Sequence, residues 1–241
     1  MVKNNYIKMN SKEIYFINFI DEKGQKYRLI LSRGKYDKSI QKFRSYLSLE
    51  EKKILKNFKV ISRQNEFIAG RILAKNNVIL INEKFTPNEI NIISGVWGFP
   101  IFSTKGINDF WVSIAHSKGY AASLLSELNT HPIGIDIEEI VPENDATLSF
   151  FLSKYNQVLS LKEKHIYWAS KEAVAKALRT GFTIPQDFFE ISEIKFNKTF
   201  YIIKFKHLQR LQVITWVKDN LVTSIAYPIE LKFDSIEKHI F

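Results

Sequence analysis

The sequence predicts an α+β fold made of two units that meet near residue 130. Stretches with strand-like alternation and stretches with helix-like periodicity occur in separate blocks, in the order strands, helices, strands, helices, strands. Segregation of this kind is typical of α+β proteins. The chain has 241 residues, of which 45% are hydrophobic, so it is long enough to bury a substantial core. Residues 1–130 and 131–241 are therefore expected to form the two halves.

In the first half, a capping box, a helix N-cap and turn signals delimit the elements. Ser48 and Glu51 have the spacing of a capping box and open a helix that is expected to reach Phe58. Ser62 is expected to cap a second helix over residues 63–75. Strands are expected at residues 13–20, 26–31, 78–81, 110–115 and 121–128, and the Gly/Pro-rich stretch 94–100 is expected to be a loop.

The second half begins with a strand at residues 131–140. Two helices follow, and the second is opened by a capping box of Ser160 and Glu163 and is expected to end near Arg179, with Gly181 as its stop signal. Four more strands are expected at residues 189–196, 200–206, 212–218 and 221–226.

Composition limits the classes of function. The chain has no cysteine, which excludes disulfides, zinc–thiolate sites and a cysteine nucleophile, and suits a cytoplasmic protein. The N-terminus lacks a signal-peptide pattern, and no stretch has the 18 consecutive apolar residues of a membrane span. The formal charge of +10 indicates an acidic partner, or else a basic surface that only keeps the protein in solution.

The stretch HPIGIDIEEI, residues 131–140, places two acids on one face of a strand. Ile133, Ile135 and Ile137 alternate with Gly134, Asp136 and Glu138. Residues two apart on one face are roughly 6.5–7 Å from each other, so the two carboxylates repel unless a cation lies between them. Oxygen ligands favour magnesium, manganese or calcium. The competing interpretation is a solvent-facing strand whose acids point into water.

Two further stretches carry residues capable of chemistry. In YWASKEAVAKAL, Trp168, Glu172 and Lys176 fall on one stripe of a helix, although Glu172 and Lys176 are also spaced as an ordinary surface ion pair. His116, in VSIAHSKGY, lies where a strand is expected to end. A single histidine there is interpreted either as a ligand-binding residue or as a structural one.

Taken together, these stretches resemble the Sfp-type 4′-phosphopantetheinyl transferases over about residues 47–181. The segments that carry the resemblance are SRQNEFIAGRILA (62–74), GFP (98–100), IAHSKGYAA (114–122), IGIDIE (133–138) and WASKEAVAKA (168–177). Two positions depart from the family pattern: Ala115 stands where a serine is frequent, and Phe99 where some members have a basic residue.

The resemblance implies two pseudo-symmetric α+β halves with the active site in the cleft between them. It implies transfer of the 4′-phosphopantetheine group from coenzyme A, the co-substrate, to a serine of a carrier protein, with release of adenosine 3′,5′-bisphosphate. Asp136, Glu138 and Glu172 would hold Mg²⁺, or Mn²⁺ in its place.

The resemblance also implies the roles of the remaining site residues. Glu172, Lys176 and His116 would be catalytic. The coenzyme A-binding residues would be Arg63, Arg71, Gly98, Pro100, His116, Asp136 and Lys176, with Lys52, Lys53 or Lys56 neutralising further phosphate charge.

The expected partner is an acidic acyl or peptidyl carrier protein, and the chain is expected to be a monomer that binds neither nucleic acid nor membrane. Two other functions compete with transfer. A metal-dependent nuclease would also use paired acids, a lysine and a basic surface, but here the sequence Glu50-Glu51-Lys52-Lys53 falls on a predicted helix rather than on a strand beside the first acid. A non-catalytic module that binds coenzyme A or a carrier protein is the other alternative.

Overall fold

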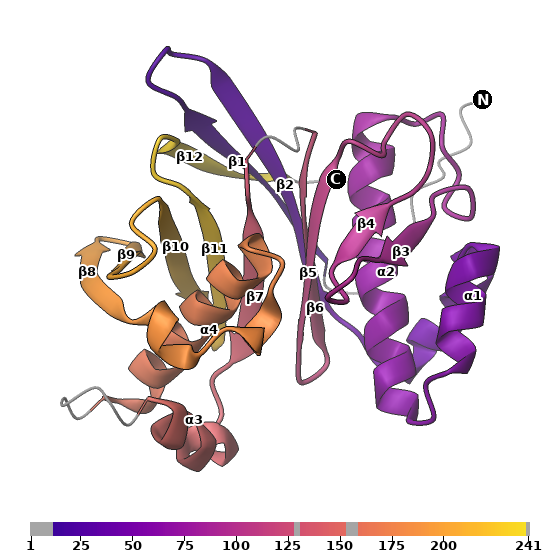
Figure 1. Ribbon diagram of the computed structural model, residues 1–241. Helices are drawn as coiled ribbons and strands as arrows, with labels where there is room; N and C mark the ends of the chain where they lie inside the picture. Colours follow the sequence, from indigo (N-terminus) through magenta and orange to yellow (C-terminus); the bar gives the residue numbers. More distant parts are fainter. Residues whose placement is uncertain (1–11, 128–130, 153–158, 240–241) are drawn as a thin grey trace. The chain divides into compact units, whose positions relative to one another are not determined.

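A computed structural model describes residues 12–127, 131–152 and 159–239 of the chain. These residues form two compact units (Figure 1). The first holds the described residues up to 127 together with the last strand, and the second runs from His131 to Leu231. Each unit combines an antiparallel sheet with helices, so the predicted α+β class is confirmed. Residue 130, where the two halves were predicted to meet, lies outside the described residues.

The first unit is built on a five-stranded antiparallel sheet. Its strands, in sheet order, are β12 (Lys232–His239), β1 (Glu13–Ile20), β2 (Lys26–Lys35), β6 (Tyr120–Ser126) and β5 (Trp111–Ser117). A tight turn with Gly24 at a φ of 80° joins β1 to β2. The predicted strand 121–128 extends to Leu128, which lies outside the described residues.

One long helix, α2 (Ile61–Ile81), covers this sheet and contacts β2, β5 and β6. Ile68, Ile72 and Leu73 on its inner face are buried. The buried side-chain amide of Asn77 donates to the carbonyl of Ile30 at 3.2 Å and to that of Ser123 at 3.0 Å. Through these two hydrogen bonds the helix is joined to β2 and β6, and the buried amide has the acceptors that it needs.

The predictions for the ends of α2 are wrong. Ser62 does not cap the helix, which begins at Ile61 after Val60 without a side-chain cap. Residues 78–81, predicted as a strand, are its last turn. Val78 and Ile79 are buried, so packing of the helix face outweighs the strand preference of β-branched residues.

Shorter elements complete the first unit. They are the 3₁₀ helix η1 (Lys38–Tyr46), α1 (Leu49–Lys56) and the hairpin of β3 (Ile92–Ser94) and β4 (Pro100–Phe102). Ser48 and Glu51 form the predicted capping box of α1. The loop predicted at 94–100 is shorter than expected, because Ser94 is the last residue of β3 and Pro100 the first of β4.

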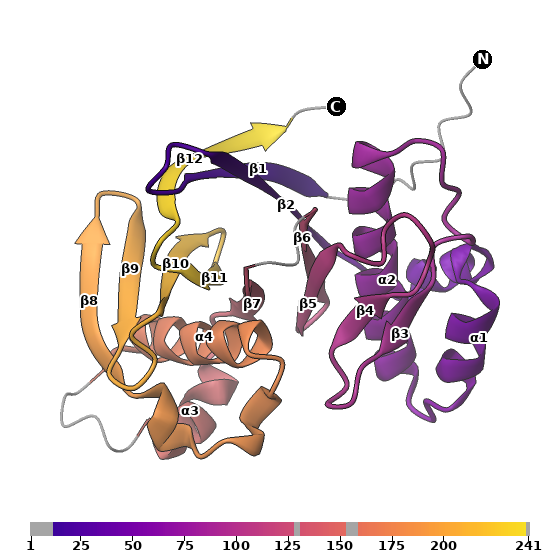
Figure 2. The same ribbon diagram turned by 45° about the horizontal axis from the view of Figure 1, so that its top comes forward.

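The second unit is also built on a five-stranded antiparallel sheet. In sheet order its strands are β7 (Gly134–Glu139), β11 (Leu221–Pro228), β10 (Leu211–Lys218), β9 (Phe200–Phe205) and β8 (Ile191–Asn197). The predicted strands therefore all occur, and β7 stands at the edge of the sheet. Figure 2 shows helix α4 (Leu161–Ala177) lying along one face of this sheet.

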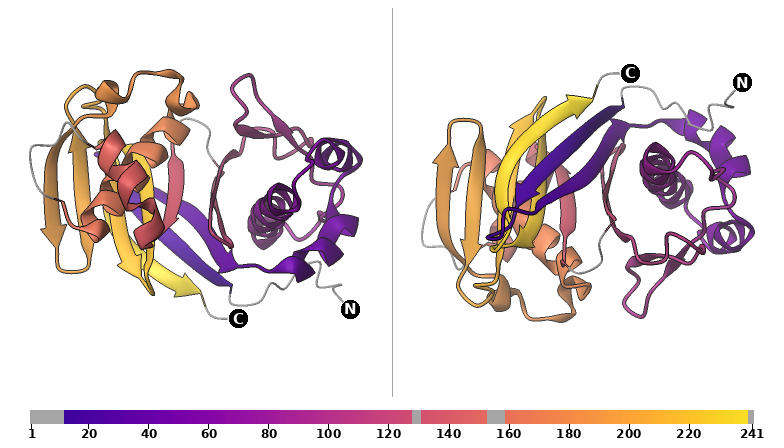
Figure 3. Two further views of the ribbon diagram at one scale, coloured as in Figure 1. Left: turned by 90° about the horizontal axis from the view of Figure 1, so that it is seen from below. Right: turned by 90° about the horizontal axis from the view of Figure 1, so that it is seen from above.

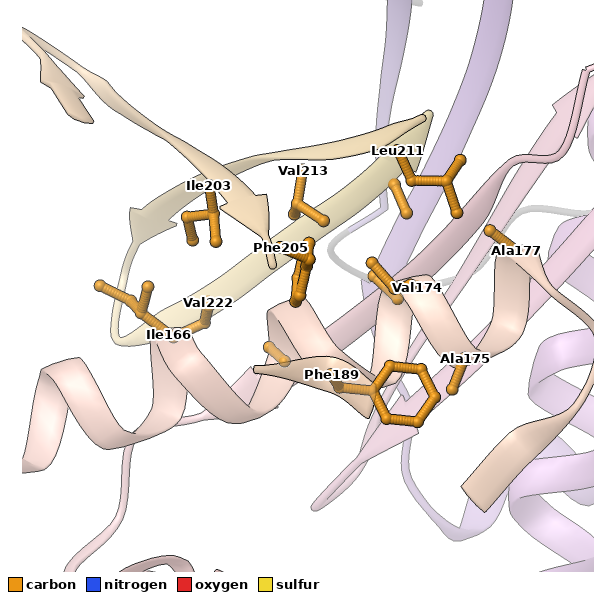
Figure 4. Close-up of a cluster of buried hydrophobic side chains, with 13 residues drawn as sticks. Ile166, Val174, Ala175, Ala177, Phe189, Ile203, Phe205, Leu211, Val213 and Val222 are labelled. Carbon is orange, nitrogen blue, oxygen red and sulfur yellow. The ribbon is translucent and has the colours of Figure 1, made fainter. Parts of the chain in front are cut away.

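Helix α4 supplies much of the core of the second unit. Its capping box of Ser160 and Glu163 forms as predicted, but the helix ends at Ala177, two residues before the expected end. Figure 4 shows the buried side chains of this core, which include Val174 of α4, Phe205 and Val213 of the sheet, and Phe189 from a segment after α4. The remaining helical segments are η2 (Pro142–Asn144), α3 (Asp145–Phe151), η3 (Gly181–Thr183) and η4 (Gln186–Phe189).

Strand β12 corrects the division at residue 130. Residues 131–241 were expected to belong to one half, but β12 pairs antiparallel with β1 and so belongs to the first unit (Figure 3). Lys238 of β12 contacts Glu13 of β1 at 2.9 Å, and Glu13 also binds Arg33 of β2 at 2.8 Å.

Within the described residues, no helix is long and apolar enough to cross a membrane.

Candidate active site

The candidate site of the second unit starts at Gly134 on β7. A Cβ atom at this position would lie 2.1 Å from the backbone oxygen of Ala173 and 2.4 Å from the backbone nitrogen of Ala177. Both atoms belong to the backbone of α4, which cannot give way as a flexible side chain would. Only glycine therefore allows α4 to lie this close to β7.

This close packing sets α4 beside the acids of β7. The Nζ atom of Lys176 lies 2.5 Å from Oδ1 of Asp136 and 3.9 Å from Oε2 of Glu172. The carboxylate of Asp136 is 4% exposed, whereas Glu172 and Lys176 are each about a quarter exposed. The ammonium group of Lys176 is thus shared between the buried carboxylate of Asp136 on β7 and the partly exposed carboxylate of Glu172 on α4.

The pKa shifts indicate a surplus of negative charge. Burial raises the pKa of Asp136 well above its usual range, Lys176 opposes the rise, and the carboxylates of Glu138 and Glu172 add to it. Burial tends to lower the pKa of Lys176, but Asp136, Glu172 and Glu138 together outweigh burial and raise it. Three carboxylates face one ammonium, so the four groups carry a net charge of −2 when all are ionised. A cation would balance that charge.

The donor set suits a hard cation in chemistry, but its side chains do not converge on one point. In the part of the chain that the structure describes, no three acidic or histidine side chains are arranged to hold a metal ion. Lys176 lies instead against Asp136. The second oxygen of Asp136, Oδ2, is nevertheless buried without a hydrogen-bond partner among the described residues. A buried carboxylate oxygen without a partner costs folding free energy unless a bound ligand interacts with it.

The predicted stripe on α4 is formed. Trp168, Glu172 and Lys176 are all partly exposed, in contrast to the buried residues on the other side of the helix. The ring of Trp168 packs against that of Phe182, with the centroids 5.2 Å apart. Lys171, which precedes Glu172, is buried, with only 3% of its surface exposed. The sequence did not single it out, although the motif contains it.

His116 lies in the first unit, near the end of β5. A Cβ atom at Gly70 of α2 would lie 2.6 Å from its Nε2 atom, so the imidazole rests directly on the helix backbone at that glycine. Its neighbour Ala115 is buried opposite Ala122. Since successive strand residues point to opposite faces, Ala115 and His116 do not face the same side.

The basic residues predicted to bind phosphate have varied surroundings. Arg63 is exposed and pairs with Glu66 at 2.8 Å. Arg71 is buried, with its Nε atom 3.6 Å from Oε1 of Glu51 and its guanidinium over the Phe67 ring. Burial lowers the pKa of Arg71 to about 10.

The three lysines of α1 also differ in their contacts. Lys53 pairs with Glu50 at 2.8 Å, Lys52 is 3.5 Å from the carbonyl oxygen of Ser45, and Lys56 is exposed. Sequence reasoning missed the more strongly held cation, Lys75, which is fully buried 2.5 Å from Glu51. Its only sequence signal is a lysine on the apolar face of α2.

Gly98 and Pro100 lie at the β3–β4 hairpin. Gly98 is exposed in the loop with a φ of 80°, and Pro100 begins β4. The ring of Phe99 packs on Gly95, where a Cβ atom would approach it to 2.5 Å. The loop therefore has a defined shape, and it presents Trp97 with 63% of its surface exposed.

Comparison with known proteins gives one family. Residues 132–226 match the family model described as the 4′-phosphopantetheinyl transferase superfamily. The matched segment contains Asp136, Glu138, Glu172 and Lys176 and covers less than half of the chain. His116 and the other predicted residues of the first unit lie outside it.

Among solved structures, the chain is similar to a holo-(acyl-carrier-protein) synthase from Bacillus anthracis strain Ames, crystallised in complex with CoA (3′,5′-ADP). The sequence identity is 23% and the TM-score 0.37, over 45% of this chain and 96% of the synthase chain. A search of curated proteins found no match.

Proposed function

We propose that this chain is a magnesium-dependent 4′-phosphopantetheinyl transferase of the Sfp type. It would transfer the 4′-phosphopantetheine group of coenzyme A to a serine of an acyl or peptidyl carrier protein. The observation that carries the proposal is the cluster of Asp136, Glu138, Glu172 and Lys176, which lies inside the segment that matches the superfamily.

In this reaction the serine hydroxyl attacks the phosphorus atom next to the pantetheine arm. A new bond forms between that phosphorus and the serine oxygen, and the bond to the bridging oxygen breaks. Adenosine 3′,5′-bisphosphate leaves with the electron pair. The protein's main tasks are positioning and charge neutralisation, since phosphoryl transfer needs little covalent help.

Glu172 is the proposed general base. Its carboxylate is about a quarter exposed and is therefore accessible to a serine from outside. It would accept the proton that the hydroxyl loses. Lys176 would place positive charge where the leaving phosphate develops negative charge, and the 2.5 Å contact with Asp136 keeps its ammonium in position.

Asp136, Glu138 and Glu172 are the residues that would hold magnesium, or manganese. The unpartnered Oδ2 atom of Asp136 and the negative surplus of the cluster support this assignment. When bound, the metal would supply positive charge to the phosphate oxygens and the leaving group.

His116 is proposed to contact a phosphate of coenzyme A, as the sequence resemblance implies. Of the two arginines, Arg63 suits the same task better than Arg71, because Arg63 is exposed whereas Arg71 is buried beside Glu51. The charge of +10 supports an acidic carrier protein as the partner, because opposite charges accelerate encounter.

Intact-mass analysis tests the proposal. Several apo carrier proteins are incubated with the chain, coenzyme A and magnesium, and adenosine 3′,5′-bisphosphate is measured in parallel. A carrier should gain one phosphopantetheinyl group for each bisphosphate released, and a chelator should abolish both. Full transfer in excess chelator would remove the metal from the proposal. Absence of both transfer and coenzyme A binding would overturn the proposed function itself.

A further inference from the structure

We infer that Gly70 is a positioning residue: its missing side chain fixes where the imidazole of His116 lies. The inference deepens the proposed function and rests on it, because His116 matters to catalysis only if it contacts coenzyme A. Nothing in the superfamily match bears on Gly70, which lies outside residues 132–226.

The contact is specific in geometry. A Cβ atom at Gly70 would lie 2.6 Å from Nε2 and 3.2 Å from Cε1 of His116, and 2.6 Å from Cγ2 of Ile114. Real Cβ atoms essentially never approach other heavy atoms to 2.6 Å. The imidazole and the Ile114 side chain therefore occupy the space that any other residue at position 70 would need.

Glycine at this position has no conformational explanation. Gly70 lies in the middle of α2, and it is absent from the residues of the chain with positive φ. Glycine in a helix interior is less stable than alanine, so the helix alone would favour alanine here. The remaining explanation is steric, and the atoms that fill the space are those of Ile114 and His116.

Gly70→Ala is therefore expected to displace the ring without unfolding the helix. The nearest atoms belong to the side chains of His116 and Ile114 and not to backbone, so these side chains can shift while the helix keeps its backbone. Ring displacement moves a nitrogen away from the phosphate that it is proposed to contact. A hydrogen bond to a charged group, once lost, lowers affinity by about 10-fold or more.

The experiment is a double-mutant cycle of Gly70→Ala and His116→Ala. Calorimetric titration with coenzyme A and thermal denaturation are measured for wild type, both single variants and the double variant. NMR of the imidazole Hε1 proton, assigned by its loss in His116→Ala, reports the ring position without any ligand. We expect Gly70→Ala to bind coenzyme A about 10-fold more weakly, to keep the wild-type melting temperature within a few degrees, and to shift the His116 resonance. In the His116→Ala background it should cause no further loss of affinity.

Two results would overturn the inference. One is wild-type affinity in Gly70→Ala, and the other is an equal loss in both backgrounds, which would assign the effect to Ile114 and general packing. Failure of the wild-type chain to bind coenzyme A would count against the proposed function. The NMR readout would then decide on Gly70 alone, since an unchanged His116 resonance contradicts the positioning role.

Discussion

Asp136 combines deep burial with a charge that its surroundings do not fully compensate. One carboxylate oxygen contacts Lys176, and the other has no hydrogen-bond partner among the described residues. Burial and two neighbouring carboxylates raise its pKa. A residue of this kind is costly for folding, and perturbed buried acids of this kind are typical of functional sites.

Asp136→Asn should therefore leave the apo protein as stable as wild type, or more stable by up to about 1–2 kcal/mol, because the amide keeps the shape and removes the buried charge, whose burial and repulsion by Glu138 and Glu172 raise the pKa of Asp136. Transfer should fall by about 100-fold or more, since the neutral amide would hold neither magnesium nor the ammonium of Lys176 in position. Denaturant unfolding and initial transfer rates measure the two effects. Glu139→Gln, on the opposite face of β7, is the matched control and should retain transfer. Normal transfer combined with a large loss of stability would make Asp136 a structural residue.

Lys75 provides a pH-dependent test in the first unit. Its ammonium donates to Glu51 at 2.5 Å and to the carbonyls of Tyr46 and Pro87. Burial lowers its pKa from 10.5 to about 8, while Glu51 opposes the shift. Between these values the unfolded chain binds a proton that the folded chain does not. The free energy of unfolding should therefore rise with pH across this window, by at most about 3–4 kcal/mol.

The check for Lys75 is equilibrium unfolding between about pH 8 and 10.5. The double variant Glu51→Gln/Lys75→Met is the control because it removes both charges together. Its stability should lack the rise that wild type shows. Parallel curves for the two proteins would mean that Lys75 keeps its proton in both states.

At the scale of elements, the site depends on how closely α4 approaches β7. Gly134→Ala would place a Cβ atom 2.1 Å from a backbone oxygen of the helix, so the helix must move. We expect a loss of about 3 kcal/mol in unfolding free energy, together with loss of transfer as Lys176 leaves Asp136. Ile137→Val on the same strand is the control, with a cost of about 1 kcal/mol and normal transfer. Wild-type stability in Gly134→Ala would refute the close packing.

Elements with local signals were predictable from the sequence, and elements set by distant contacts were not. The capping boxes at Ser48 and Ser160 form as predicted because capping joins residues only three apart. The 78–81 segment was predicted wrongly. Its β-branched residues favour a strand locally, but packing of the α2 face against distant parts of the first unit favours the helix. The stripe of Glu172 and Lys176 follows from helical spacing, whereas the contact of Lys176 with Asp136, 40 residues away, does not.

At the scale of the whole chain, β12 joins the C-terminal segment to the first strand. It was not predicted, because its partner β1 lies more than 200 residues earlier in the sequence. Residues of the segment alternate only weakly, and Ile236 is partly exposed. Pairing along the edge of β1 therefore decides the conformation of this segment.

Deletion of residues 232–241 should loosen the first unit selectively. β1 would lose the hydrogen bonds of one edge, so its amides should exchange with solvent faster. Amides of β7, β10 and β11 should keep their protection. Hydrogen–deuterium exchange with mass spectrometry measures both sets in one experiment. Equal loss of protection in both sheets would show that β12 stabilises more than the unit to which it is paired.

The central claim is that the cluster of Asp136, Glu138, Glu172 and Lys176 carries out phosphopantetheine transfer. The most direct measurement is single-turnover transfer to an apo carrier protein, followed by intact mass, for wild type and Glu172→Gln. Glu172 is partly exposed, so its substitution should leave the fold and the melting temperature unchanged. We predict that the carrier gains the phosphopantetheinyl mass with wild type, and that Glu172→Gln slows the step by about 100-fold or more because the general base is lost. A folded Glu172→Gln variant that modifies the carrier at the wild-type rate would contradict the account.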